Sequence, residues 1–197
     1  MARQGELFRD PMDPGQADLH GLAPDPAAPP LLRHQLTRWQ SRLAAHQAPL
    51  FAGLGSTTQQ ASLLQADGPP PGQFNPLQLQ AQPLSFWRGA PALVQGAALY
   101  FVMDQPEALE HPLLLYVGET ARAEQRWKGE HDCKAYLAAY GDALQRAALS
   151  TRLSIRFWCD VPAETRARRQ LEQALIRHWL PPFNKETRGR WATPFQA

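Results

Sequence analysis

Residues 113–127 read LLLYVGETARAEQRW and predict a strand, a turn and the start of a helix. The run begins with five apolar residues, which have the length of a strand and end at Gly118. Arg126 follows Tyr116 by ten positions. We expect Arg126 on a helix that Thr120 caps, because a threonine hydroxyl can accept a hydrogen bond from a first-turn amide.

The sequence around this stretch predicts an α+β domain. Residues 96–103 and 113–117 are apolar runs of strand length joined by a polar connection, so we expect an antiparallel hairpin. Alternation over residues 153–158 predicts a third strand, and helices are expected over residues 136–148 and from Pro162 onward. The expected fold is a small three-stranded antiparallel sheet flanked by helices, preceded by a largely irregular N-terminal extension.

The first half of the chain holds most of the 19 prolines. Residues 1–30 have no apolar periodicity, and we expect a disordered tail. Residues 31–47 predict an amphipathic helix that Pro49 stops. This helix could pack on the domain, bind a partner or touch phosphates through its arginines. Residues 48–91 are expected to be a proline-rich linker or a wrapping arm, and residues 92–197 the folded domain.

Charge and cysteine content limit the class of protein. The net charge of +2 does not indicate any class of partner. From Thr151 onward, however, the chain holds nine Lys or Arg against four Asp or Glu. This local excess could bind a polyanion, or the arginines could lie on solvated helix faces. Two cysteines without a CxxC pair exclude a cysteine zinc site and favour a reducing compartment. No apolar run has the length of a signal peptide core or a membrane span, so we expect a soluble cytoplasmic protein.

Five side chains on the expected elements could meet. Tyr100 and Tyr116 lie on neighbouring strands, Arg126 on the next helix, Glu172 on the last helix and Asn184 just beyond it. Each alone has an ordinary explanation, because strand tyrosines usually pack in a core and helix charges usually face solvent. Glu172 lies among apolar residues, where a carboxylate needs a partner or a cation.

In this order the motifs closely resemble the GIY-YIG nuclease superfamily over about residues 93–185. The motifs are Leu99-Tyr100, Tyr116-Val117-Gly118, Arg126-Trp127, LEQALI at 171–176 and PPFNK at 181–185. The resemblance implies a metal-dependent endonuclease that hydrolyses phosphodiester bonds in nucleic acid, with DNA as the expected substrate. It also implies one divalent cation, Mg²⁺ or Mn²⁺.

The resemblance implies a role for each matched residue. Tyr100 and Tyr116 match the two motif tyrosines, Arg126 the family arginine, and Glu172 the single metal-binding carboxylate. Asn184 matches the asparagine near the end of the domain and is expected to fix the loop or Tyr100. An unperturbed tyrosine has a pKa of about 10, so a water-activating hydroxyl needs positive charge nearby. Tyr100 is our first choice for the base, with Tyr116 orienting the water or the phosphate.

The sequence departs from the family pattern at two places. Ala98 stands where the first motif has glycine. Glu130 occupies the position, four residues after the arginine, where many relatives have His or Tyr, and His131 is one position later, rotated by about 100° on a regular helix. His131 is therefore either the catalytic proton acceptor or a surface histidine, and Tyr136 or Lys128 could accept the proton instead.

Basic residues are expected to contact the nucleic-acid backbone. They are Lys128, Arg168, Arg169, Lys185 and Arg188. Two other functions stay open. The fold could bind nucleic acid without cleaving it, or the protein could recruit a protein partner through its N-terminal extension. The sequence contains no recognisable zinc finger or helix-turn-helix pattern, so it does not indicate which nucleic-acid sequence or structure is bound.

Overall fold

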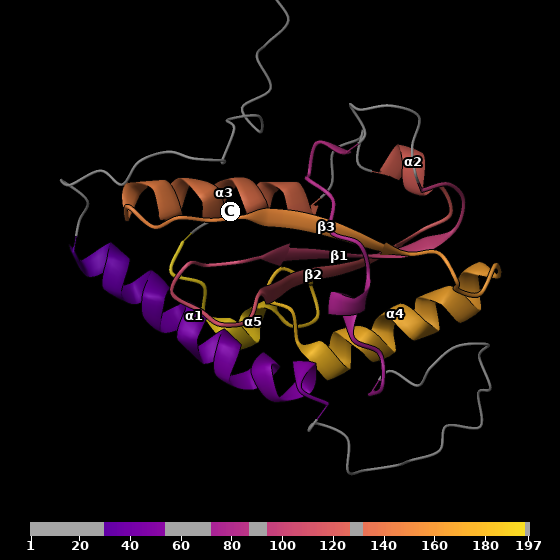
Figure 1. Ribbon diagram of the computed structural model, residues 1–197, viewed down its shortest axis with the longest axis horizontal. Helices are drawn as coiled ribbons and strands as arrows, with labels where there is room; N and C mark the ends of the chain where they lie inside the picture. Colours follow the sequence, from indigo (N-terminus) through magenta and orange to yellow (C-terminus); the bar gives the residue numbers. More distant parts are fainter. Residues whose placement is uncertain (1–29, 54–71, 87–93, 127–131, 196–197) are drawn as a thin grey trace, which may run out of the picture.

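The computed structural model describes residues 30–53, 72–86, 94–126 and 132–195 (Figure 1). The elements are α1 (Pro30–Phe51), a 3₁₀ turn η1 (Pro76–Gln78), β1 (Ala98–Asp104), β2 (Leu113–Thr120), α2 (Ala123–Arg126), α3 (Asp132–Arg146), β3 (Leu153–Trp158), α4 (Thr165–Trp179) and α5 (Arg188–Trp191). The expected fold class is confirmed, with one three-stranded antiparallel sheet flanked by helices. None of the helices among the described residues is long and apolar enough to cross a membrane.

The sheet has β1 at its centre, in the order β2-β1-β3, and every residue of β1 is buried. Alternate residues of β1 face two separate apolar clusters. Tyr100 belongs to the cluster formed with α1, α3 and the C-terminal chain, whereas Phe101 belongs to the one formed with α4. Figure 1 shows α3 and α4 on opposite sides of the sheet.

A bulge in β2 decides which way Tyr116 points. The pairs on either side of it are Met103–Leu114 and Val102–Tyr116, so Leu115 is an extra residue. Leu115 and Tyr116 consequently both pack on the α3 side. In a regular strand Tyr116 would turn to the α4 side, because side chains alternate with a period of two. The bulge therefore places it on the same face as the motif tyrosine of β1.

Both edges of the sheet are covered without a further strand. At β2, the Gln47 side-chain amide accepts from the Leu114 N–H (2.8 Å) and donates to the Leu114 carbonyl (2.9 Å). At β3, Gln82 and Ile155 exchange two backbone hydrogen bonds of 2.8 Å. Helix α1 and the segment 72–86 thus protect the edges from pairing with another chain.

The segment 72–86 also contributes to the core. The Phe74 ring stacks on Trp158 with 4.2 Å between centroids, and Phe86 meets Phe157 edge-on at 4.9 Å. These rings lie on opposite faces of the sheet, since one pair belongs to the α4 side and the other to the α3 side. The segment therefore wraps around β3.

The prediction that Pro49 stops the first helix is wrong, because α1 continues to Phe51. Proline removes one amide donor from the helix, and this costs stability. Packing compensates here: Phe51 is buried, and its ring centroid lies 4.6 Å from that of Trp179. The tail expected over residues 1–30 lies almost entirely outside the described residues.

Other helix boundaries also differ from the expectation: the helix predicted over residues 136–148 is α3, which spans Asp132–Arg146. Thr120 is the last residue of β2, and its hydroxyl accepts from the Arg122 N–H at 3.0 Å. It therefore stabilises the turn before α2 instead of capping a helix at Ala121. Helix α4 begins at Thr165, not at Pro162, so the proline lies in the preceding loop.

Candidate active site

The two motif tyrosines lie side by side on the α3 face of the sheet. Tyr100 is 0 % exposed, and its ring centroid is 5.9 Å from that of the half-buried Tyr116. The Tyr100 ring lies over Gly118, its partner across the strands. A Cβ on Gly118 would be 2.8 Å from Tyr100 Cε1 and nearer still to Cζ and the hydroxyl oxygen. The glycine of this motif is required by the close approach of the tyrosine ring.

Asn184 fixes the outer edge of β2 next to Tyr116. Its Oδ1 accepts from the Val117 N–H at 2.9 Å, and its Nδ2 donates to the Val117 carbonyl at 2.8 Å. The preceding residue, Phe183, donates its N–H to the Leu115 carbonyl at 3.0 Å. Asn184 is buried and acts on the backbone of β2 in the way that a neighbouring strand would. Through these bonds Asn184 holds the backbone of β2, whereas the sequence led to the expectation that it fixes the loop or Tyr100.

We expect Asn184→Ala to lower the free energy of unfolding by about 2–4 kcal/mol, because two buried backbone groups of Val117 lose their partners. Asn184→Asp should also destabilise the fold, since it places a carboxylate oxygen against the Val117 carbonyl. Urea unfolding measures both effects. Lys185→Ala, at the exposed neighbouring position, is the control and should change the value by less than about 0.5 kcal/mol. An Asn184→Ala variant as stable as this control would contradict the assigned role.

Glu172 is a partly buried carboxylate of α4. Its pKa is raised from 4.5 to about 7, chiefly by burial and then by the charges of Glu119 and Glu186, while a hydrogen bond with the Glu119 backbone and the charge of Arg169 act in the opposite direction. Glu119 directly follows Gly118 on β2, so Glu172 lies near the end of the strand that carries the second motif. Its ionised form thus lacks sufficient positive charge nearby.

This environment fits a hydrated divalent cation. A cation would supply the charge that burial and neighbouring carboxylates leave unbalanced. Mg²⁺ takes oxygen ligands, keeps several waters and is held by one or two carboxylates. Among the described residues, no group of three or more His, Cys, Asp or Glu side chains could hold a metal. If a Mg²⁺ ion binds at this place, Glu172 would be its side-chain anchor, with water filling the remaining positions.

Glu119 already has two guanidinium partners. Its carboxylate lies 2.9 Å from Arg168 Nε and 3.2 Å from Arg169 Nε. Sequence reasoning missed this residue, although period-two alternation after Gly118 turns it toward α4. Glu119 thus has two cationic partners, whereas Glu172 has no ion pair with any described residue.

Arg168 differs from the expectation that it contacts nucleic acid. It is 1 % exposed and also donates to the carbonyls of Pro162 (3.1 Å) and Ala163 (2.9 Å). Its guanidinium joins the loop before α4 to the end of β2. A buried arginine with all these partners cannot reach a phosphate in solvent, so this prediction is wrong.

The other predicted basic residues fall into two groups. Arg169, with a side chain 67 % exposed, and Lys185 reach solvent. Arg188 is partly buried, donates to the Tyr136 hydroxyl at 2.6 Å and lies over that ring at 5.3 Å. Tyr136 therefore stays open as an alternative proton acceptor, because Arg188 gives its hydroxyl the neighbouring positive charge that such a role needs. Lys128 lies outside the described residues.

The arginine helix is attached to the start of β1. The Ala123 N–H donates to the Gly96 carbonyl at 2.8 Å, and the Glu124 carboxylate accepts from the Gly96 N–H at 3.1 Å. Arg126 is the last residue of α2. His131 lies in the segment after it, outside the described residues. The structure therefore places Tyr100 and Tyr116 side by side on the α3 face and Asn184 on the Val117 backbone at the edge of β2, whereas Glu172 is on α4, which covers the other face, close to Glu119.

Comparison with known proteins adds no relative: no protein-family model matches the chain, and neither does any curated protein or solved structure. What the site does must therefore be inferred from its motifs and its geometry.

Proposed function

We propose that this chain is a metal-dependent endonuclease of the GIY-YIG type, which hydrolyses phosphodiester bonds in nucleic acid. DNA is the expected substrate, and Mg²⁺ or Mn²⁺ the expected cation. The main support is Glu172, a carboxylate with a pKa of about 7 near the end of the strand that carries Tyr116. A cytoplasmic location suits the two free cysteines, Cys133 and Cys159.

The charge of the reaction explains why these residue types are needed. Attack of water on a phosphodiester adds negative charge to the phosphate oxygens. A bound Mg²⁺ would supply positive charge at that point and assist ionisation of water. Glu172 would hold this cation. Arg126, which the resemblance assigns to the phosphate, would provide a second positive group.

Burial separates the roles of the two tyrosines. Tyr100 is 0 % exposed, so its hydroxyl is poorly placed to take a proton directly from a water on the substrate. Tyr116 is half-buried, on the same face and held by the contact of Asn184 with Val117. We therefore assign proton acceptance to Tyr116 and positioning to Tyr100, which reverses the preference drawn from the sequence. Activation of Tyr116 still requires neighbouring positive charge, because an unperturbed tyrosine has a pKa of about 10.

The test is a cleavage assay on plasmid, branched and single-stranded DNA with Mg²⁺ or Mn²⁺. We expect the wild type to cleave, and Glu172→Ala and Arg126→Ala each to cleave about 10²–10³-fold more slowly, as when a group that stabilises transition-state charge is removed. Glu186→Ala is the matched control. This exposed carboxylate is close enough for its charge to act on Glu172, but it belongs to no motif. It should retain activity within a few fold.

Two outcomes would contradict the nuclease assignment. One is the absence of metal-dependent cleavage on every substrate. The other is cleavage by Glu172→Ala at the wild-type rate, which would indicate a contaminating nuclease. Steeply salt-dependent DNA binding without cleavage would instead favour a non-cleaving binding module.

A further inference from the structure

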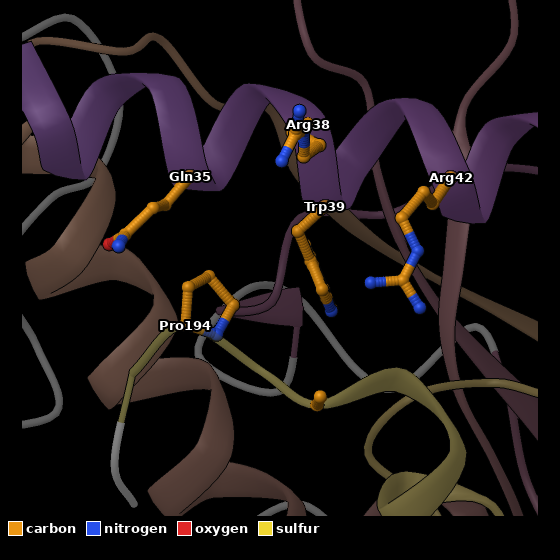
Figure 2. A pocket seen from close by; sticks show the side chains of 6 residues that line it. Gln35, Arg38, Trp39, Arg42 and Pro194 are labelled. Atoms are coloured by element: carbon orange, nitrogen blue, oxygen red, sulfur yellow. The ribbon is translucent and has the colours of Figure 1, made fainter.

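A hollow of about 420 Å³ lies between α1 and the chain that follows α5 (Figure 2). Its lining residues are Gln35, Arg38, Trp39, Arg42, Ala192 and Pro194. The three polar side chains that line it from α1 are all exposed, so the hollow is open to solvent. None of the lining residues is acidic.

Trp39 supplies a buried hydrogen-bond donor at this hollow. The residue is 2 % exposed, and its indole Nε1 is buried with no hydrogen-bond partner among the described residues. In Figure 2 the nitrogen end of the indole points toward the C-terminal chain, between Pro194 and Arg42. The ring is held by Phe183, stacked with 6.4 Å between centroids, and by Phe195, edge-on at 5.9 Å. A fixed, buried and unpaired N–H is rare in folded proteins and calls for an acceptor.

Two guanidinium groups accompany this donor. Arg38 and Arg42 are one helical turn apart, and neither has a hydrogen bond or ion pair with any described residue. Helix α1 contains no Asp or Glu that could offset them. Like charges at this spacing repel and destabilise a helix. Figure 2 shows the Arg42 guanidinium directed toward the C-terminal chain. The hollow thus combines positive charge and hydrogen-bond donors, and none of the described residues that line it is an anion.

We propose that this hollow binds a phosphate group of a nucleic-acid backbone, so that α1 forms a second contact beyond the active site. The choice of nucleic acid over another polyanion rests on the proposed nuclease function. Phosphodiester oxygens accept hydrogen bonds and carry charge, which complements two guanidiniums and an indole N–H. The hollow is also connected to the site: Phe183 stacks on Trp39, and the next residue, Asn184, holds β2.

The test measures DNA binding by the full chain in a Glu172→Ala background, so that cleavage does not interfere. Anisotropy of a labelled duplex, recorded between 50 and 200 mM salt, gives the Kd and its salt dependence. For Arg38→Gln/Arg42→Gln we expect Kd to rise about tenfold and the slope of log Kd against log salt to fall by about 1–2, as for the loss of two phosphate contacts. Arg38→Lys/Arg42→Lys keeps both charges and should keep most of the slope.

Two further variants sharpen the test. Arg146→Gln/Arg152→Gln removes two exposed positive charges elsewhere and should leave both quantities close to the parent values. Trp39→Phe removes the indole N–H but keeps an aromatic ring, and we expect about threefold weaker binding, as for the loss of one hydrogen bond. Thermal melts confirm that each variant is folded. If the double Gln variant does not fold, Arg42→Gln alone takes its place, with about half the change in slope.

Three results would overturn the proposal. Equal Kd and slope in the Arg38→Gln/Arg42→Gln variant and its parent would exclude a phosphate contact here. Equal losses in this variant and in Arg146→Gln/Arg152→Gln would show an effect of overall charge. Inorganic phosphate that stabilises the parent but not the Arg38→Gln/Arg42→Gln variant, with unchanged DNA affinity, would assign the hollow to free phosphate. Failure of the nuclease assignment can be told apart from failure of this proposal. It appears in the cleavage assay, as cleavage that is absent or that Glu172→Ala does not affect, and not in the binding measurements.

Discussion

Gly118→Ala is expected to lower the free energy of unfolding by about 1–3 kcal/mol, the usual cost of overpacking a core. The added Cβ would lie 2.8 Å from Tyr100 Cε1 and closer to Cζ and the hydroxyl oxygen, whereas real Cβ atoms essentially never approach within 3.0 Å. The Tyr100 ring is fully buried and cannot turn into solvent to make room. Displacement of the ring also disturbs Tyr116 beside it, and we expect cleavage to fall about 10²-fold, as a misplacement of about 1 Å can cause.

Gly189→Ala is the matched control for this substitution. Gly189 is exposed on α5, and a Cβ there would meet nothing within 4 Å. The control should be neutral or should stabilise the protein by up to about 1 kcal/mol, as alanine does in a helix. A double-mutant cycle with Tyr100→Ala isolates the clash, since removal of the ring should recover about 1 kcal/mol or more of the Gly118→Ala cost. Additive effects in this cycle would show that Tyr100 does not enforce the glycine.

The sheet could be predicted largely from local pattern. The third strand was expected over residues 153–158, where its side chains alternate, and β3 spans Leu153–Trp158. The hairpin followed from two apolar runs with a short connection, although β2 extends beyond the predicted end to Thr120. The bulge at Leu115 could not be predicted, because it exists only in the pairing of β2 with β1. It nevertheless decides that Tyr116 shares a face with Tyr100.

The burial and the hydrogen-bond partners of individual polar side chains are harder to predict from the sequence. Glu172 could be recognised from its apolar neighbours, which imply burial of the carboxylate. Arg168 has the same local appearance as the exposed Arg169, and only the packing of α4 on β2 separates them. Gln47 and Asn184 act on backbone groups 67 residues away in sequence, a relation that no local pattern encodes.

Glu172→Gln is expected to remove cleavage and, at the same time, to stabilise the fold at pH 8. The folded pKa of Glu172 is raised from 4.5 to about 7, chiefly by burial. Below pH 4.5 the carboxyl is protonated in both the folded and unfolded chain, and its contribution to stability is complete. As pH rises toward 7 the unfolded chain releases the proton first, so the wild type loses this stability. Because Glu172 is only partly buried, we expect a gain for the variant of about 1–2 kcal/mol at pH 8 after solvent screening, and little at pH 5.

Denaturant unfolding at pH 5 and pH 8, with and without Mg²⁺, tests both parts of this prediction. In the absence of a cation, Glu186→Gln is the control and should change stability by less than about 0.5 kcal/mol, because its carboxylate is exposed. Saturating Mg²⁺ at about 100 times its Kd should stabilise the wild type by about 2.7 kcal/mol and leave Glu172→Gln unchanged. Equal stabilisation of the two proteins would mean that the cation binds elsewhere. A Glu172→Gln variant that is no more stable than the wild type at pH 8 would show that the ionised Glu172 does not destabilise the fold. Cation binding would then have no unfavourable buried charge to compensate.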